Sequence, residues 1–409
     1  MYILVINSGS SSIKYQLFPA DSDQAICSGL IERIGQESSQ LTHKLLTPGR
    51  EQTIRLDQPV RGHAAGMQAL TAVLTRPDIA VIENPTDIVT VGHRVVHGGE
   101  TLTATTVITP EVKEKIIALY ALAPLHNPGH IKGIEVAEKL FPHAVQVAVF
   151  DTAFHRTLPA EAYRYAIPEK FYAEDAIRVY GFHGISHEFV AREAAVYLGK
   201  PDAKLITIHL GNGCSMAAVD GGRCIDTSMG MTPLDGLVMG TRCGSIDPSV
   251  LLYLSEQKGY TTDQISDLLN KQSGMKGLSG HNDMRNVSEL YAAGDPAAQL
   301  AYALYTYRIK KFIGAYAAAL NGLDAIVFTA GVGENDALTR ELVCRDMDFL
   351  GIRLDPAANR ARNSQLRDLS TPDARTRVLV VPTNEELAIA RECREMRTRP
   401  ATQSEQQRY

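Results

Sequence analysis

Polar, glycine-containing clusters that directly follow short apolar runs hold most of the residues that could do chemistry. The run Tyr2–Ile6 leads into Asn7–Lys14, a segment of Ser and Gly that ends on a cation. Consecutive backbone N–H groups in such a turn can wrap an anion, and the lysine can neutralise it. His209–Gly213 follows the apolar run Leu205–Ile208 and could bind an anion in the same way. A plain hairpin turn explains either cluster alone, but the matched pair favours a polyphosphate ligand, without the GxxxxGK pattern of a Walker A loop.

A third glycine cluster, Gly331–Asn335, follows the apolar run Ala325–Thr329. It precedes Asp336, where a helix is expected to begin. Its glycines would let a flat or phosphorylated ligand approach the backbone closely. A strand-to-helix turn without a ligand explains the pattern equally well.

Two arginines lie in glycine-rich loops. Arg94 stands within Gly92–Gly99, flanked by two histidines, and Arg242 stands near Gly240. A guanidinium in such a setting can fork onto a phosphate or a carboxylate. A single loop arginine is more often part of a surface ion pair. Two of them, together with His183 in a Gly-Phe-His-Gly segment and Asp151 after a strand, favour a site for anions.

Hard oxygen donors that suit Mg²⁺ shared with phosphates occur at three places. They are Asn7, Asp151 and the pair Glu385–Glu386. The two glutamates also stand at the start of an expected helix, where negative charge is favourable. His183 and His187 are four residues apart but lack the intervening carboxylate of an HExxH motif, so we do not expect zinc.

The elements that must position these residues are short strands alternating with helices. Six Val- and Ile-rich runs are predicted to be buried strands: Tyr2–Ile6, Asp87–Val91, Gln146–Phe150, Leu205–Ile208, Ala325–Thr329 and Arg377–Val381. Helices are predicted over Glu111–Leu122 and Asp295–Leu320. The hairpin Tyr2–Phe18 is repeated within Lys204–Thr227, which predicts two similar lobes. Because open α/β sheets bind ligands beyond the carboxyl ends of their strands, the six ends suggest one large site.

Composition excludes several classes of protein. The 409 residues predict two or three domains, and a net charge of −5 argues against binding nucleic acid or an anionic membrane. No apolar run approaches the length of about 20 residues that crosses a bilayer. Met1–Asn7 is typical of a strand rather than a signal peptide. Six scattered cysteines without a CxxC pair indicate neither disulfides nor zinc, and they fit the cytoplasm.

Taken together, the motifs resemble the acetate kinase (acetokinase) family in order from residue 2 to about residue 390. They are INSGSSSIKY, VGHRVVHGGE, APLHNPGH, VFDTAFH, YGFHGISH, HLGNG, DTSMGMTPLDGLVMGTRCGSIDP, FTAGVGEN and PTNEELAIA. The resemblance implies the two-lobed α/β fold of actin, sugar kinases and chaperone ATPases, each lobe a mixed sheet with flanking helices. It also implies an N-terminal lobe of residues 1–150 plus 384–409, for acetate, metal and a phosphate loop. The second lobe, 151–383, would bind the nucleotide and form a homodimer.

The resemblance further implies roles for individual residues. Those that would bind ATP are Lys14, His209, Leu210, Gly211, Asn212, Gly213, Asp283, Met284, Arg285, Gly331, Val332, Gly333, Glu334 and Asn335. Those that would act in catalysis are Arg94, which would hold the substrate carboxylate, Asp151, His183 and Arg242. Asn7 and Glu385 would bind Mg²⁺, with Mn²⁺ as an alternative, and Val96, Leu125, Phe182 and Pro233 would line the pocket for the substrate methyl group. Family members usually read Asp-x-Arg-Asp near residue 283, and Asn286 replaces the last Asp here.

The implied reaction is ATP plus acetate to ADP plus acetyl phosphate, reversible and by direct in-line transfer. A small carboxylic acid is already ionised at pH 7, so Asp151 is expected to orient an arginine or a metal-bound water rather than move a proton. Val96 is expected to favour acetate over propionate. A propionate kinase, a sugar or polyol kinase and a non-catalytic ATP-switched protein are the alternatives, and the residues do not distinguish ATP from GTP.

Overall fold

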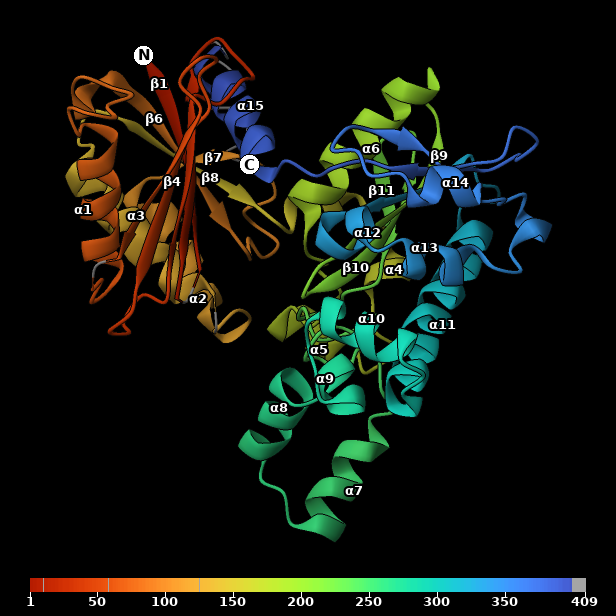
Figure 1. Ribbon diagram of the computed structural model, residues 1–409. Helices are drawn as coiled ribbons and strands as arrows, with labels where there is room; N and C mark the ends of the chain where they lie inside the picture. The colour runs from red at the N-terminus through yellow and green to blue at the C-terminus, as the bar shows by residue number, and fades with distance from the viewer. Residues whose placement is uncertain (10, 58, 125, 399–409) are drawn as a thin grey trace. The chain divides into compact units, whose positions relative to one another are not determined.

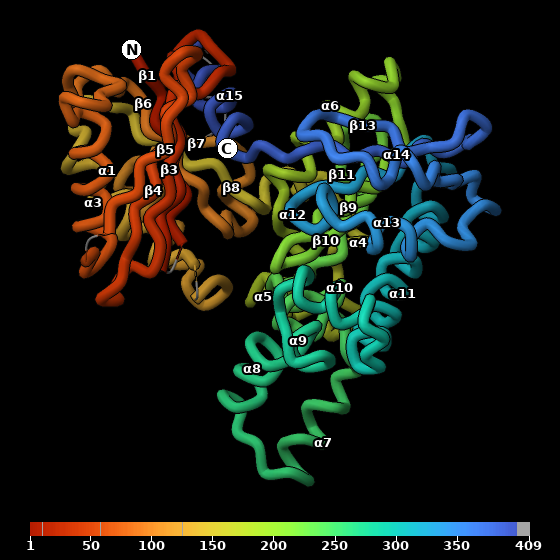
Figure 2. The backbone as a smooth tube through the Cα atoms, viewed as in Figure 1, coloured from red at the N-terminus to blue at the C-terminus, as the bar shows by residue number. Residues whose placement is uncertain are grey.

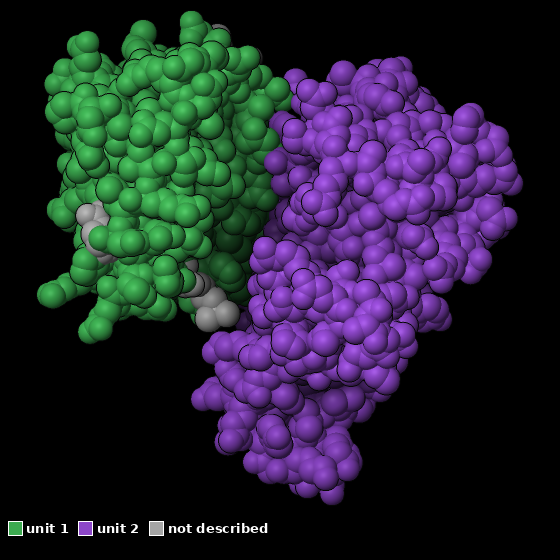
Figure 3. All heavy atoms as spheres, in the orientation of Figure 1, with its two compact units in different colours: residues 1–153, 384–409 green, residues 154–383 purple. Residues whose placement is uncertain are grey.

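The computed structural model describes residues 1–9, 11–57, 59–124 and 126–398, and its chain forms two compact units (Figures 1 and 3). Unit 1 comprises Met1–Ala153 and the C-terminal segment from Asn384, and unit 2 comprises Phe154–Thr383. Asp151, which the expected boundary assigned to the second lobe, therefore lies in unit 1. Its backbone N–H continues the ladder of that unit by donating to the Val95 carbonyl at 3.0 Å.

Unit 1 is built on an eight-stranded mixed sheet in the order β5-β4-β3-β2-β1-β6-β8-β7. Its strands are β1 Tyr2–Ser8, β2 Ile13–Pro19, β3 Cys27–Glu32, β4 Gln40–Leu45, β5 Gln52–Asp57, β6 Ile88–Val95, β7 Thr106–Val107 and β8 Val145–Phe150. Strands β1, β6 and β8 are parallel, whereas β1 to β5 form an antiparallel meander. Its helices are α1 His63–Leu74, α2 Pro110–Ala118, α3 Asn127–Leu140 and α15 Glu385–Thr398.

Helices cover both faces of this sheet. Met67 and Leu70 of α1 are fully buried in a core shared with β1 to β4 and with the end of α3. Helix α15 packs on the opposite face, where Gly92 of β6 makes room for it (Figure 1). A Cβ at Gly92 would lie 2.7 Å from both Ile389 and Cys393. The glycine thus lets α15, and with it Glu385, dock on the central strand.

Unit 2 is built on a six-stranded mixed sheet in the order β11-β10-β9-β12-β14-β13. Its strands are β9 Lys204–Leu210, β10 Cys214–Asp220, β11 Arg223–Thr227, β12 Ala325–Thr329, β13 Arg367–Asp368 and β14 Arg377–Val380. Its helices are α4 Ala160–Tyr163, α5 Lys170–Asp175, α6 Gly184–Leu198, α7 Ser249–Lys258, α8 Thr262–Lys271, α9 Gly274–Ser279, α10 Met284–Ala292, α11 Pro296–Ala319, α12 Ala330–Asn335, α13 Ala337–Cys344 and α14 Pro356–Arg360.

The two faces of this second sheet are covered by α6 and α11. Successive residues of a strand point to opposite faces: the Cys214 sulfur lies 3.4 Å from the Tyr305 hydroxyl on α11, whereas Ser215 bonds to His187 on α6. Helices α7 and α8 extend away from the sheet, and no residue of α7 is buried (Figure 2). Among the described residues, no helix has the length and apolar character needed to cross a membrane.

The predicted α/β fold of two lobes, each a mixed sheet with flanking helices, is confirmed. The six predicted strands are β1, β6 and β8 of unit 1 and β9, β12 and β14 of unit 2, which are the parallel strands of the two sheets. The orders β3-β2-β1-β6-β8 and β11-β10-β9-β12-β14 also share one connectivity, so the predicted duplication extends from the hairpins to five strands in each unit.

Three local predictions differ from the structure. Asn7 and Lys14 pair across the β1–β2 ladder, so the first turn is shorter than the predicted Asn7–Lys14 loop. Helix α2 ends at Ala118 and is followed by a short 3₁₀ turn instead of continuing to Leu122. Gly331–Asn335 belongs to α12, a short helix, rather than to an open turn.

Candidate active site

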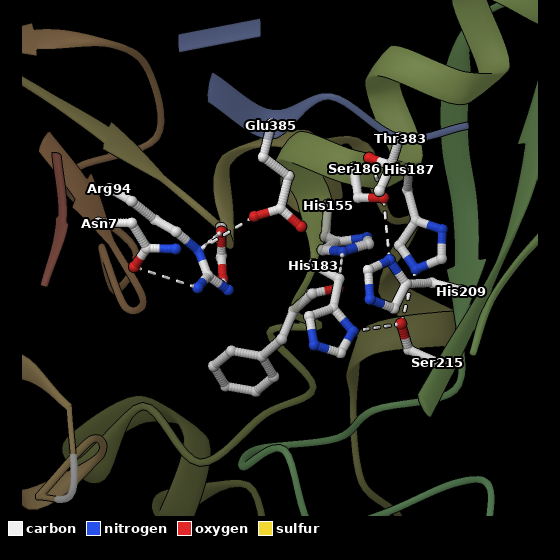
Figure 4. A network of polar contacts seen from close by, with 12 residues as sticks. Asn7, Arg94, His155, His183, Ser186, His187, His209, Ser215, Thr383 and Glu385 are labelled. Atoms are coloured by element: carbon white, nitrogen blue, oxygen red, sulfur yellow. Dashed lines mark hydrogen bonds and ion pairs between the residues drawn. The ribbon is translucent and has the colours of Figure 1, made fainter. Parts of the chain in front are cut away.

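The parallel strands of unit 1 bring the predicted residues to their carboxyl ends. Asn7 lies near the end of β1 and Arg94 near the end of β6 (Figure 4), and Asp151 comes directly after β8. Neighbouring parallel strands end at the same edge of a sheet, so three residues far apart in sequence meet there. Glu385, the first residue of α15, completes the group.

The Arg94 guanidinium is held by a bidentate pair with Asp151. Its Nη2 lies 2.6 Å from Asp151 Oδ2 and its Nε lies 3.0 Å from Oδ1. Nε also lies 3.6 Å from Glu385 Oε2, and Nη1 donates to Asn7 Oδ1 at 3.5 Å. Such a two-point fork fixes the plane of the guanidinium. Arg94 therefore has one orientation before any ligand binds.

Opposing effects set the protonation of this pair. Burial, helped by the charge of Glu385, raises the pKa of Asp151 above its usual value, although the charge and hydrogen bonds of Arg94 oppose the rise. Burial lowers the pKa of Arg94, but Asp151 and Glu385 together outweigh burial and raise it. The direct guanidinium–carboxylate contact keeps Asp151 ionised near neutral pH, because protonation would leave a buried arginine without its main counter-charge.

Lys14 lies beside this group and makes an ion pair with the next glutamate of α15. Its Nζ is 2.8 Å from Glu386 Oε1, and the lysine side chain is half exposed whereas the glutamate is buried. Asn384 caps the same helix by accepting the backbone N–H of Leu387 at 3.0 Å. Both glutamates thus stand at the N-terminus of α15, where the helix dipole favours negative charge.

The donors around Arg94 were tested for their fit to a divalent metal. Three carboxylates, those of Asp151, Glu385 and Glu386, face the two cations Arg94 and Lys14, so the group is negative overall. No set of three or more His, Cys, Asp and Glu side chains in the described part of the chain forms a cluster that could hold a metal alone. Carboxylate and amide oxygens suit Mg²⁺ when substrate phosphates supply the remaining ligands, so the residues fit a metal shared with a nucleotide.

The histidines next to Arg94 in the sequence have structural surroundings. His93 is fully buried, and its Nε2 lies 2.8 Å from Gln146 Oε1. His97 accepts the backbone N–H of Gly99 at its Nδ1. Burial lowers the pKa of both rings to about 4, so both are neutral at pH 7.

The second predicted anion turn, His209–Gly213, lies between β9 and β10 of unit 2. The rings of His183 and His209 stack with their centroids 4.2 Å apart and an interplanar angle of 18°. A Cβ built at Gly213 would lie 3.5 Å from both His183 Nε2 and Arg242 Nη1, and the His209 Nε2 atom lies near Gly211. Two imidazole edges and a guanidinium therefore surround this turn, as an anion site requires.

Backbone contacts of the Arg242 loop hold this turn in place. Gly240 donates its N–H to the Asn212 carbonyl at 3.1 Å, and a Cβ at Gly240 would lie 2.2 Å from Asn212 Oδ1. A side chain at position 240 would therefore displace the Asn212 amide from its place beside the turn. Arg242 donates to the Pro233 carbonyl at 2.8 Å, and burial lowers the pKa of its guanidinium.

Hydroxyl groups that the sequence analysis did not single out connect the histidines of unit 2. Ser215 Oγ lies 2.8 Å from His183 Nδ1 and 2.7 Å from His187 Nε2 (Figure 4). Ser186 Oγ lies 2.9 Å from His209 Nδ1. No sequence pattern marks these serines, because a serine in a buried strand or helix is compatible with any packed core. His187, weighed and rejected as a zinc ligand, is instead a member of this network.

A cavity of about 1480 Å³ opens in unit 2 beside the same turn. Of the predicted ATP residues, it is lined by Gly211, Asn212, Asp283, Met284, Arg285, Gly331, Val332, Glu334 and Asn335. His209, Leu210, Gly213 and Gly333 belong to the elements beside it and do not line it. Asp283 is the N-cap of helix α10, and it forms an exposed ion pair with Arg285 in the first turn of that helix.

A buried arginine that the sequence analysis missed supports the wall of this cavity. Arg340 is 1% exposed and donates to the Gly333 carbonyl at 2.8 Å and to Asn359 Oδ1 at 2.8 Å. Burial lowers its pKa to about 10. Glu334 accepts the backbone N–H of Thr383 at 3.1 Å. These bonds fix the short helix α12 at the side of the cavity.

The predicted methyl-pocket residues divide between the units. Val96 is buried in unit 1, after β6, and Phe182 is buried in unit 2. Pro233 lies beside Arg242 through the carbonyl contact described above. Leu125 lies outside the described residues.

Comparison with known proteins gives consistent matches along the chain. The acetokinase family model matches residues 2–391. The acetate kinase of Flavobacterium johnsoniae is 53% identical over 390 residues, which is 95% of this chain and 98% of that protein. The crystal structure of Porphyromonas gingivalis acetate kinase is 42% identical, with a TM-score of 0.91 and coverage of 97% of this chain and 100% of that one. A propionate kinase from Francisella tularensis is 43% identical, with a TM-score of 0.89 and coverage of 96% and 99%.

Proposed function

Because the chain belongs to the acetokinase family, we propose that it transfers the γ-phosphoryl group of ATP to acetate, giving ADP and acetyl phosphate. The observation that carries this proposal is the guanidinium of Arg94, held at the end of β6 by a bidentate pair with Asp151. A pre-oriented guanidinium is suited to fork onto a substrate carboxylate. The relatives that are about 50% identical are named acetate kinases, which does not favour the propionate alternative.

The proposed reaction forms a bond between a carboxylate oxygen of acetate and the γ-phosphorus while the bond from that phosphorus to the ADP oxygen breaks. Acetate is ionised at pH 7, so no proton has to leave the nucleophile. Arg94 binds the carboxylate, and Asp151 orients Arg94 rather than acting as a base. Arg242 and His183, which both lie beside Gly213, stabilise the charge on the transferring phosphoryl group.

The nucleotide occupies the cavity of unit 2 in this proposal. Asp283–Arg285 and Gly331–Asn335 frame the nucleoside, His209–Gly213 contact the phosphates, and Lys14 adds a cation from unit 1. Asn7 and Glu385 hold a divalent metal, with Mg²⁺ proposed and Mn²⁺ as an alternative, which neutralises phosphate charge when bound. Val96, Leu125, Phe182 and Pro233 line the pocket for the methyl group of acetate.

We also propose a homodimer formed through unit 2, located in the cytoplasm. Exposed apolar side chains support the dimer, and they gather on the two helices α7 and α11: Val250, Leu252, Tyr253, Leu300, Leu304 and Tyr307. A helix such as α7, without a buried residue, gains its packing from a partner. The six cysteines are all free thiols, as expected in a reducing compartment.

A trapping assay tests the proposed activity. The purified protein is incubated with ATP, Mg²⁺ and hydroxylamine, which converts an acyl phosphate to a hydroxamate, and acetate, propionate, butyrate or glycerol is the acceptor. We expect hydroxamate with acetate, at least about tenfold lower kcat/KM with propionate, and no ADP with glycerol. ADP formation with glycerol and no hydroxamate with acetate would instead identify a polyol kinase.

A further inference from the structure

The ring of His183 is held in an unusual way at the N-terminus of helix α6. Its backbone is left-handed, with φ 56° and ψ 24°, a conformation that a residue with a side chain rarely adopts. As the N-cap of α6 it makes no side-chain capping bond. Its Nδ1 lies instead against the hydroxyl of Ser215. Strain of this kind persists where the surroundings fix a functional geometry.

Behind Ser215, a chain of hydrogen bonds continues to strand β9. Ser215 Oγ lies 2.7 Å from His187 Nε2, and His187 Nδ1 lies 2.7 Å from Thr207 Oγ1. The Thr207 hydroxyl donates to the Ala217 carbonyl at 3.4 Å. Ser215, His187 and Thr207 are all fully buried, so water does not compete for these bonds.

The direction of this chain follows from counting protons. A hydroxyl has one proton, and the proton of Thr207 is donated to Ala217. This direction makes Thr207 the acceptor of the 2.7 Å bond with His187 Nδ1, whose direction depends on the tautomer of that ring. The ring of His187 is neutral, because burial and the neighbouring rings of His155 and His209 lower its pKa well below 6.5. Its Nε2 then has only a lone pair, which accepts the proton of Ser215.

We propose that Ser215 is a positioning residue that fixes both the orientation and the tautomer of His183, through the chain Thr207–His187–Ser215. Because the Ser215 proton is committed to His187, Ser215 can only accept from His183 Nδ1. The neutral His183 ring is then protonated at Nδ1, and its Nε2, the atom near Gly213 and Arg242, has a lone pair. This inference rests on the proposed function only for the consequence that the ring fixed in this way faces the transferring phosphoryl group.

Other charged or titratable groups also face the His183 ring. His209 of β9 stacks on it, and its Nδ1 is held by Ser186 in turn. Arg242 shares Gly213 as a neighbour, and His155 bonds to the carbonyl of Phe182, the preceding residue. None of these contacts supplies Nδ1 of His183 with the 2.8 Å partner that Ser215 provides.

Two variants test the two ends of the hydrogen-bond chain from Thr207 to Ser215. Ser215→Ala removes the shared hydroxyl, and Thr207→Val removes the distant acceptor while keeping the side-chain volume. Ser228→Ala is the matched control, since Ser228 is also buried and its hydroxyl accepts the backbone N–H of Met216 at 2.8 Å. Circular dichroism and thermal unfolding establish that each variant is folded.

The tautomer is read by NMR of the full-length protein labelled with ¹⁵N-histidine, at a pH where the His183 ring is neutral. We expect wild-type His183 and the control to be protonated at Nδ1. In Thr207→Val, His187 loses the acceptor of its Nδ1 proton and is protonated at Nε2 instead. Its Nε2–H then donates to Ser215. The Ser215 hydroxyl donates in turn to His183 Nδ1, so His183 is protonated at Nε2. A wild-type ring protonated at Nε2, or an unchanged ring in Thr207→Val, would overturn the proposal.

Kinetics give the second readout. We expect Ser215→Ala to lower kcat about 10- to 100-fold, the range for loss of a partner that orients a ligating histidine, with little change in KM for acetate. The double variant with His183→Ala should be no slower than His183→Ala alone, since Ser215 acts through that ring. Additive losses would overturn the proposal. The NMR result needs no turnover, so it stands apart from failure of the proposed activity.

Discussion

The side chains at the carboxyl ends of the strands differ strongly between the two sheets, although five strands of each sheet share one connectivity. At the carboxyl ends of β1, β6 and β8, Arg94 is paired with carboxylates. At the corresponding end of β9 in unit 2, Arg242 bonds to a neutral backbone carbonyl, and the nearby histidines bond to serine hydroxyls. The duplicated scaffold therefore has an edge of net negative charge in unit 1, and in unit 2 an edge of imidazole rings and one guanidinium.

This difference in charge favours different ligands at the two edges. The edge of unit 1, with three carboxylates against two cations, suits a metal ion and one small carboxylate on Arg94. The edge of unit 2, where the described residues place no carboxylate in an ion pair with Arg242, suits phosphate oxygens. The comparison teaches that one topology supports two kinds of site because strand ends, not strands, hold the chemistry.

The largest difference that we expect between the two units is in their stability at low pH. Burial lowers the pKa of His43, His93 and His97 to about 4 and that of His130 to about 3 in unit 1, against His155, at about 4, and His187 in unit 2. The unfolded chain binds more protons between pH 6.5 and pH 4, so stability is lost as the pH falls through this window, by on the order of 10 kcal/mol in unit 1. Hydrogen exchange measured by mass spectrometry should show the β1–β6 amides losing protection before the β9–β12 amides. The reverse order would contradict the assignment.

Breaking the buried pair should affect unit 1 next most strongly. Asp151→Asn leaves the buried charge of Arg94 without its main partner, so we expect a loss of about 3 kcal/mol in unfolding free energy and a raised KM for acetate. Asp78→Asn, in an exposed pair with Arg76, is the control and should cost less than about 1 kcal/mol. Chemical denaturation measures both. A titration of kcat near neutral pH that disappears in Asp151→Asn would show that Asp151 acts as a base after all.

In unit 2, activity and stability should separate at His183. His183→Asn should lower kcat about 100-fold, because the imidazole that stabilises the transferring phosphoryl group is lost. Its unfolding free energy should stay within about 1 kcal/mol of wild type, since relief of the left-handed backbone offsets the lost bond to Ser215. Ala176→Gly relieves a similar backbone, φ 51°, away from the site and should leave kcat unchanged. Equal losses of activity and stability would indicate a structural role for His183.

The smallest expected effect concerns the choice of acid. Val96 is buried directly after β6, two residues beyond Arg94, so Val96→Ala should make room for one more methylene. A methylene is worth about 1–3 kcal/mol, and we expect the preference for acetate over propionate to shrink about tenfold. The ratio of kcat/KM values for the two acids measures it. An unchanged ratio would remove Val96 from the pocket.

The sequence predicts the parallel strands of both cores well, but it predicts the side-chain contacts between elements poorly. Runs such as Ala325–Thr329 are apolar up to their last residue because both faces are buried, and this pattern is strong. The ends of those runs gave Asn7, Arg94 and Asp151, since a polar residue after a buried strand must lie at a sheet edge. Strands β3 to β5 were not predicted, because their polar residues alternate with apolar ones in an irregular way.

Contacts between distant segments were beyond the sequence. The bond between Ser186 and Thr383 joins residues 197 positions apart, and Lys14 meets Glu386 only because α15 packs on β6 beside Gly92. Nothing in the local sequence of Ser215 separates it from any buried serine. Such contacts depend on how elements pack, which a single chain without its fold does not specify.

The most direct test of the two-edge account is a comparison of Arg94→Ala with Arg242→Ala in steady-state kinetics, with acetate and ATP each varied. If Arg94 binds the carboxylate and Arg242 the phosphoryl group, Arg94→Ala should raise KM for acetate at least about tenfold with KM for ATP unchanged. Arg242→Ala should lower kcat by about 10³-fold, with a much smaller change in KM for acetate. Two variants with the same pattern of kcat and KM changes would contradict the account.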